Sequence, residues 1–178
     1  MNLPNRLTVM RIIAIPFFIF FLMAPFVPFG KWIAFALFIV ASLTDFLDGY
    51  IARKNNLITD FGKFADPLAD KLLVCSALIC LLAFGKISYI IVLIIISRDF
   101  IISGFRLVAA SKGVVIAADW SGKVKTALQM VMIPMIIAEL KFLYWPTIVL
   151  EIVVTALTVI SLIECIVKNR AVLKEDKK

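Results

Sequence analysis

The sequence contains no histidine, which removes the side chain that proteins most often use as a general base and metal ligand near neutral pH. Charged residues are also scarce, at 17% of the 178 residues, whereas 63% are hydrophobic and the mean hydropathy is +1.06. Soluble domains have about 25% charged and about 45–50% apolar residues. The composition therefore predicts an integral membrane protein, and the length suits a single domain, residues 1–178.

Only three cysteines are present, Cys75, Cys80 and Cys165, and all of them lie within apolar segments. Because a free cysteine behaves as a small hydrophobic residue, these positions predict packing rather than disulfides or a thiolate metal site. The sequence also lacks internal repeats, low-complexity segments and an A-x-A-like cleavage site after its first apolar run. Membrane insertion is therefore expected to depend on the apolar segments themselves.

Six apolar segments are long enough to cross a bilayer as helices, which takes about 20 residues each. They cover residues 9–28, 31–52, 66–85, 87–108, 123–142 and 144–167. Of the 19 Lys and Arg residues, all but Lys31, Lys86, Lys141 and Arg98 fall on one side of these segments. By the positive-inside rule, both termini and both long loops are cytoplasmic. We therefore expect an all-α integral membrane protein with six transmembrane helices, preceded by a short juxtamembrane helix at the N terminus.

The net charge of +7 does not indicate a nucleic-acid partner. The basic residues flank the apolar segments, where they set the orientation and contact anionic lipids. No basic stripe or motif typical of nucleic-acid binders is present. The expected surroundings of this chain are membrane lipid.

Four aspartates lie where two apolar segments meet a cytoplasmic loop, namely Asp45, Asp48, Asp66 and Asp70. A charged side chain at the centre of a membrane helix costs about 2.5–3.5 kcal/mol, so such a cluster needs a compensating partner. Each pair shares a helical face, provided that the second helix begins near Thr59 or Asp60. Facing carboxylates suit Mg²⁺ or Mn²⁺. The alternative, pairing with neighbouring Lys and Arg residues, accounts for one or two of the aspartates but not for their spacing.

The aspartates belong to a longer pattern, D-x-x-D-G-x-x-A-R, followed after eight residues by G-x-x-x-D-x-x-x-D. This pattern resembles the signature of the CDP-alcohol phosphotransferase family and matches it at every position. The matching residues are Asp45, Asp48, Gly49, Ala52, Arg53, Gly62, Asp66 and Asp70. The segments 2–11 and 122–129 resemble the branch of the family that uses glycerol 3-phosphate. The resemblance covers essentially the whole chain.

The resemblance implies transfer of the phosphatidyl group of CDP-diacylglycerol to sn-glycerol 3-phosphate, which gives phosphatidylglycerophosphate and CMP in anionic phospholipid synthesis. It also implies a homodimer, two metal ions (Mg²⁺ or Mn²⁺) held by the four aspartates, and Asp70 as the base for the acceptor hydroxyl. With no histidine available, chemistry also favours a carboxylate as the base. The residues implied in binding CDP-diacylglycerol are Asn5, Thr8, Gly49, Ala52, Arg53 and Gly62. Equally, Asn5 and Thr8 could cap a juxtamembrane helix.

The phosphate of the acceptor requires cations. Asp99, Ser103 and Arg106 form a polar stripe at i, i+4 and i+7 of one predicted helix, from which Arg98 is rotated by about 100°. The predicted phosphate-binding residues are Arg98, Arg106, Lys123 and Lys125. In the alternative interpretation, the two lysines only flank a membrane segment, and Arg98 and Asp99 are a packing charge pair.

The alternative functions of the same class involve the same phosphatidyl transfer to a different acceptor, namely inositol phosphate, serine or a second phosphatidylglycerol. A cationic pocket favours a phosphorylated alcohol, which weakens the case for serine. A metal-binding transporter is the alternative from a different class. It is disfavoured because transporters often show repeats and polar sites at the bilayer midplane, whereas here the polar cluster lies at one face.

Overall fold

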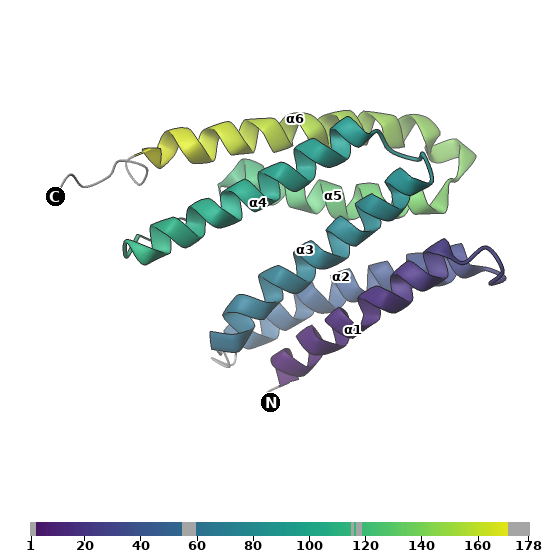
Figure 1. Cartoon of the computed structure of the whole chain (residues 1–178), viewed down its shortest axis with the longest axis horizontal. Helices are drawn as coiled ribbons and strands as arrows, with labels where there is room; N and C mark the ends of the chain where they lie inside the picture. Colours follow the sequence, from purple (N-terminus) through teal and green to yellow (C-terminus); the bar gives the residue numbers. More distant parts are fainter. Residues whose placement is uncertain (1–2, 55–59, 115, 117–118, 171–178) are drawn as a thin grey trace. The chain divides into compact units, whose positions relative to one another are not determined.

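A computed structural model describes residues 3–54, 60–114, 116 and 119–170, with the backbone alone for 3–7, 45–54 and 60–64. These ranges contain six α-helices, one 3-10 helix and no strand (Figure 1). The helices are α1 Leu3–Met23, α2 Gly30–Lys54, α3 Asp60–Ala83, α4 Tyr89–Ser111, α5 Trp120–Ala138, η1 Lys141–Leu143 and α6 Tyr144–Lys168. The predicted all-α fold is confirmed for the described residues.

The N terminus differs from its prediction. Leu3–Met23 is one continuous helix, so the separate juxtamembrane helix that we expected there is wrong. The physical reason is that Pro4 fits the first helical turn, and no glycine or further proline interrupts the chain before Pro16. The predicted start of α3 at Asp60 is confirmed, and Pro67 therefore lies well inside that helix, where its missing N–H removes one intrahelical hydrogen bond.

One helical stretch among the described residues, Lys141–Lys168, is long and apolar enough to cross a membrane, and it comprises η1 and α6. Two shorter apolar stretches, Thr8–Met23 and Gly30–Thr44, lie in α1 and α2. Charged residues also occur along α3 and α4. The helix number agrees with the sequence, whereas the crossing of a membrane by all six helices stays a prediction.

The chain divides into two compact units. Unit 1 comprises Met1–Ile87 and Ile133–Leu140, and unit 2 comprises Ser88–Met132 and Lys141–Lys178. In unit 1, α1 packs against both α2 and α3, and these three helices run side by side in purple to teal in Figure 1. In unit 2, α4 packs against α6.

Small and aromatic residues at helical spacing form the core of unit 1. The ring of Phe18 on α1 lies 5.9 Å from the ring of Phe38 on α2, and both side chains are buried. The buried stripe of α3 consists of Ala65, Ala69, Leu73 and Ala77. Small residues at four-residue spacing let helix backbones approach closely, as in membrane helix packing. Asp66 and Asp70 on α3 each directly follow a buried alanine of this stripe.

A tight turn reverses the chain between α1 and α2. A β-carbon at Gly30, the first residue of α2, would lie 2.5 Å from the backbone oxygen of Phe21, so only glycine fits there. The reversal makes α2 run back along α1. As a result, the C-terminal end of α2 lies beside the N-terminal end of α1.

Candidate functional site

The segments that carry the four aspartates are helical, as their spacing predicted. The helix α2 continues through Asp45 and Asp48, and α3 continues through Asp66 and Asp70. Because α1, α2 and α3 alternate in direction, the start of α1, the end of α2 and the start of α3 lie at the same end of unit 1 (Figure 1). All four aspartate positions therefore belong to this one end, which we call the aspartate end.

The buried face of α2 extends along the helix toward the aspartate end. Ala34, Phe38 and Ala41 are buried on α2. Asp45 and Asp48 follow Ala41 by four and seven residues, so their positions fall on the same helical face. The contacts of these two aspartates, and of Asn5, Gly49, Ala52, Arg53 and Gly62, lie outside the described residues, and their binding roles stay predictions.

Thr8 connects the first helix to an aspartate of the signature. The Thr8 side chain is fully buried, and its hydroxyl donates a hydrogen bond to Oδ1 of Asp66, 58 residues further along the chain. Hydrogen bonds of this kind fix the orientation of carboxylates that bind metals. One such bond uses only part of the acceptor capacity of a carboxylate. Thr8 lies inside α1, so it does not cap a helix.

Arg11 also belongs to this region, and its place in the sequence predicted no role beyond membrane orientation. Its side chain is only 3% exposed, and its Nε donates to the backbone oxygen of Ala41 at 3.2 Å. The available signal was its spacing, because Arg11 follows Thr8 by three residues on the buried face of α1. Arg11 thus adds a positive charge within unit 1, one turn of α2 before Asp45.

Within the described side chains, no group of three or more metal-ligating residues gathers. Two of the four aspartates lie outside those side chains, so this finding does not test the predicted metal set. Asp66 and Asp70, one turn apart on α3, are the described half of it. Asp66 accepts the hydrogen bond from Thr8, and Asp70 also has an interaction partner.

Unit 2 contains a second candidate site, a cavity of about 90 Å³. Arg98 and Arg106 of α4 and Lys123 of α5 line it, together with Asp119. Asp119 accepts a hydrogen bond from Lys168 at 2.8 Å, so this carboxylate of the lining already has a cation. Three cations around a small cavity suit a compact dianion such as a phosphate monoester.

Two cations of this cavity have no counter-ion within the described part of the chain. Among the residues that the structure describes, neither Arg106 nor Lys123 forms an ion pair, and both are exposed. The cavity also includes Gly122, in the first turn of α5. Backbone N–H groups in a first helical turn lack intrahelical partners, and the helix dipole there favours negative charge. The electrostatics of the cavity therefore favour an anion.

The face of α4 that lines the cavity differs from the predicted polar stripe. Arg98, Ile102 and Arg106, spaced by four residues, line it. Asp99 and Ser103 do not, and the Ser103 hydroxyl donates to the backbone oxygen of Asp99. Of the predicted stripe, Arg106 alone reaches this cavity.

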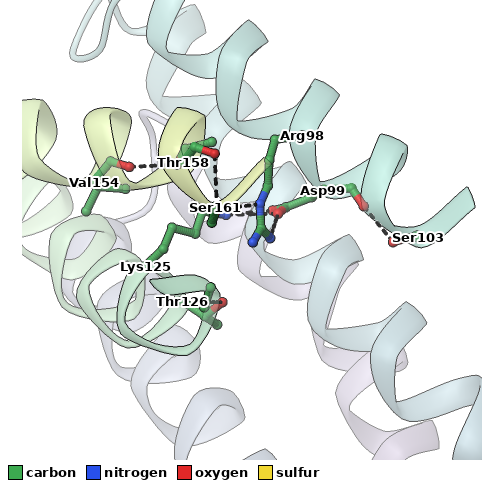
Figure 2. Close-up of polar contacts among 9 residues, drawn as sticks. Arg98, Asp99, Ser103, Lys125, Thr126, Val154, Thr158 and Ser161 are labelled. Atoms are coloured by element: carbon green, nitrogen blue, oxygen red, sulfur yellow. Dashed lines mark hydrogen bonds and ion pairs between the residues drawn. The ribbon is translucent and has the colours of Figure 1, made fainter. Parts of the chain in front are cut away.

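Asp99 holds two cations in unit 2. Lys125 donates to both carboxylate oxygens of Asp99 at 2.9 Å, and Nη1 of Arg98 donates to Oδ1 at 2.9 Å (Figure 2). The charge pair of Arg98 and Asp99, which the alternative interpretation of the sequence contained, is therefore present, and the role of Arg98 in binding phosphate stays a prediction. Lys125 is 1% exposed and does not line the cavity, unlike the other three residues predicted to bind the acceptor phosphate.

Comparison with known proteins defines the class to which these features belong. Residues 1–164 match the model of the CDP-alcohol phosphatidyltransferase family, and the chain belongs to this family of transferases. It is 48% identical over 141 residues to the CDP-diacylglycerol–glycerol-3-phosphate 3-phosphatidyltransferase of Bacillus subtilis (strain 168). This match covers 73% of this chain and 73% of that relative. The protein of the same name from Rickettsia bellii (strain RML369-C) is 47% identical over 131 residues, or 72% of this chain and 71% of that relative.

Proposed function

We propose that this protein transfers the phosphatidyl group of CDP-diacylglycerol to sn-glycerol 3-phosphate, giving phosphatidylglycerophosphate and CMP. The names of relatives at 47–48% identity support this activity. The structural observation that carries it is the gathering of all four aspartate positions of the family signature at one end of unit 1. This product is an intermediate of anionic phospholipid synthesis.

Members of this family generally depend on a metal ion. The proposed ligands are Asp45, Asp48, Asp66 and Asp70, and the proposed metal is Mg²⁺ or Mn²⁺ as two ions, because both prefer carboxylate oxygens. The described part of this set fits: Asp66 and Asp70 lie one turn apart, and Thr8 orients Asp66. When bound, the metal supplies neutralisation of negative charge on the pyrophosphate.

Asp70 is proposed as the base of the reaction. Its carboxylate takes the proton of the acceptor hydroxyl as the hydroxyl oxygen bonds to the phosphorus of the phosphatidyl group. The bond from that phosphorus to the oxygen of CMP then breaks, and CMP leaves with the bonding electrons. Positioning and electrostatic stabilisation contribute most of the rate in phosphoryl transfers of this kind.

The nucleotide end of CDP-diacylglycerol is proposed to bind near the aspartates. The residues proposed for it are Asn5, Thr8, Gly49, Ala52, Arg53 and Gly62. Gly49, Ala52 and Gly62 have little or no side chain, so a bulky ligand can approach the helix backbone there. Arg53 supplies a cation for the phosphates.

The cavity of unit 2 is proposed to bind the phosphate of glycerol 3-phosphate. Arg98, Arg106 and Lys123 line it, and the last two have no counter-ion among the described residues. A cavity with this excess of positive charge favours a phosphorylated acceptor over serine. Lys125, the fourth predicted cation, is buried, pairs with Asp99 and does not line the cavity, so the proposed phosphate site does not include it.

The proposed setting is the cell membrane, crossed by all six helices, with both termini and the active site at the cytoplasmic face. The distribution of Lys and Arg supports this orientation. The apolar stretch Lys141–Lys168 supports membrane insertion. A homodimer is proposed from the family resemblance alone.

A substrate panel tests the function. The purified protein receives CDP-diacylglycerol and Mg²⁺ with glycerol 3-phosphate, inositol phosphate, inositol, serine or phosphatidylglycerol, and CMP release is followed. Release with glycerol 3-phosphate, together with phosphatidylglycerophosphate in the lipid extract, is the expected result. Activity with serine and none with glycerol 3-phosphate would overturn the acceptor assignment. Metal transport without CMP release would overturn the enzyme class.

A further inference from the structure

Two of the three guanidinium nitrogens of Arg98 have fixed partners. Its Nε donates to Oγ of Ser161 on α6 at 3.0 Å, and its Nη1 donates to Oδ1 of Asp99 at 2.9 Å (Figure 2). Within the described part of the chain, Nη2 donates to no acceptor. Because the guanidinium group is planar and rigid, fixing two of its nitrogens also fixes the direction in which the third nitrogen donates. Arg98 therefore presents one fixed donor to the cavity that it lines.

The two partners of Arg98, Ser161 and Asp99, are themselves held in place by further hydrogen bonds. Ser161, 2% exposed, donates in turn to the backbone oxygen of Thr158 at 3.1 Å, so its hydroxyl position is set within α6. Asp99 is fixed from α5 by the buried ammonium of Lys125. Thus residues of three helices, α4, α5 and α6, determine where the Arg98 side chain lies.

Gly122 leaves the space that Nη2 occupies. A β-carbon at Gly122 would lie 2.9 Å from Nη2 of Arg98, and that nitrogen is its nearest neighbour within 4 Å. The contact involves the far end of a flexible side chain, so a larger residue would displace the guanidinium rather than the backbone. Gly122 lies in the first turn of α5 and lines the same cavity. A glycine here weakens the helix relative to alanine, so helix stability does not account for it, whereas the space that Nη2 needs does.

We propose that Gly122 and Asp99 position Arg98 so that its Nη2 donates a hydrogen bond to the phosphate of the acceptor. Gly122 is then a specificity-determining position, Asp99 and Ser161 are positioning residues, and Lys125 is the counter-ion of Asp99 and does not touch the acceptor. This inference rests on the proposed function, because it assigns a ligand to the same cavity. It adds a reason for selecting phosphorylated alcohols, since a fixed donor is lost on an acceptor without a phosphate.

Gly122→Ala is the central test, and Gly104→Ala is its matched control. Both glycines lie in helices of unit 2, but a β-carbon at Gly104 would have nothing within 4 Å. We expect Gly122→Ala to raise the KM for glycerol 3-phosphate about 10- to 100-fold, the range for a lost hydrogen bond to a charged group. The KM for CDP-diacylglycerol should change less than about twofold, and the melting temperature should hold or rise, because alanine favours a helix. Gly104→Ala should leave both KM values unchanged.

A double-mutant cycle with Arg98→Lys shows whether Gly122 acts through Arg98. Lysine has no Nη2, so adding Gly122→Ala to Arg98→Lys should raise the KM for glycerol 3-phosphate no further. Multiplying effects of the two substitutions would overturn the inference, as would an unchanged KM in Gly122→Ala. If the wild type shows no turnover with glycerol 3-phosphate, the proposed function fails. The cycle is then measured by the inorganic phosphate concentration that gives half-maximal thermal stabilisation. Additivity there overturns the action of Gly122 through Arg98, and no stabilisation of the wild type by phosphate overturns the anion site itself.

The role of Asp99 is tested with its charge partner. Asp99→Asn alone removes a carboxylate that pairs with the buried ammonium of Lys125, and this variant can fail to fold. The double variant Asp99→Asn with Lys125→Met removes one charge of each sign and so keeps the net charge of the cluster. We expect the double variant to fold and to show a raised KM for glycerol 3-phosphate, with an unchanged KM for CDP-diacylglycerol. Lys125→Met alone keeps the pairing of Arg98 with Asp99 and should change that KM less than about threefold. A wild-type KM in the double variant would overturn the positioning role of Asp99.

Discussion

The hydroxyl of Thr8 on α1 donates a hydrogen bond to Oδ1 of Asp66 on α3, which joins the first helix to an aspartate of the family signature. The contact is buried on the side of Thr8. It gives a residue outside the aspartate signature a defined way to influence metal binding, because the orientation of Asp66 depends on it.

Thr8→Val removes this donor at nearly constant volume. We expect the Mg²⁺ concentration for half-maximal CMP release to rise about 10- to 100-fold, the usual effect of losing a hydrogen bond to a metal ligand. Thr8→Ser keeps the hydroxyl and should behave nearly as the wild type. A lower maximal rate with an unchanged Mg²⁺ requirement would contradict a role through Asp66 and would favour direct contact with the nucleotide.

Asp70→Asn tests the proposed base. The amide has almost the same shape but cannot take a proton, so turnover should fall by a factor of about 10² to 10⁴. Binding of CDP in the presence of Mg²⁺, measured by calorimetry, should be retained at least in part. The two measurements separate proton transfer from binding. Turnover close to that of the wild type would remove Asp70 as the base.

The sequence was sufficient for helix order and for the register within each helix. Apolar length determined the number of helices, and the four-residue spacing of Asp66 and Asp70 placed them on one face of α3, which begins at Asp60 as expected. Such patterns depend on neighbours within a few turns, so they can be recognised without knowing the rest of the fold.

Contacts between helices were not predictable in this way. The pairing of Asp99 with Lys125 joins α4 to α5, and the rotation of each helix about its axis depends on side-chain packing along its whole length. Arg11 was missed for a related reason. A cation near the end of an apolar segment is typical of membrane orientation, and only packing against α2 shows that this one is buried.

Arg106→Gln tests the cationic cavity of unit 2. The substitution removes a charge that has no ion-pair partner among the described residues, and we expect the KM for glycerol 3-phosphate to rise about tenfold or more. The KM for CDP-diacylglycerol should stay within about twofold. Arg170→Gln is the matched control, because it removes the same charge from an exposed arginine that does not line the cavity. Equal effects of Arg106→Gln on both substrates would show a general loss of structure or of surface charge instead.

Glu139 forms a polar cluster with two lysines in unit 1. It follows α5 directly and accepts hydrogen bonds from Lys86 and, at 3.4 Å, from Lys31. Its backbone φ of 51° lies in the left-handed region, which disfavours residues other than glycine. The hydrogen bond from Lys86 is the main cause that lowers the pKa of the Glu139 carboxyl below its ordinary value of 4.5, while partial burial opposes this shift.

Because the pKa is lower in the folded state, the cluster stabilises the fold above the ordinary pKa, and this stabilisation is lost as the pH falls through the lowered value. Glu139→Gln should therefore lower the melting temperature at pH 7 and make it less dependent on pH below about 4.5. The effect corresponds to less than about 1 kcal/mol, since the carboxylate is 39% exposed. Glu139→Gly loses the same contacts but relieves the backbone, so it should melt above Glu139→Gln. Identical melting curves for wild type and Glu139→Gln at pH 7 and pH 4 would show that the cluster contributes nothing to stability.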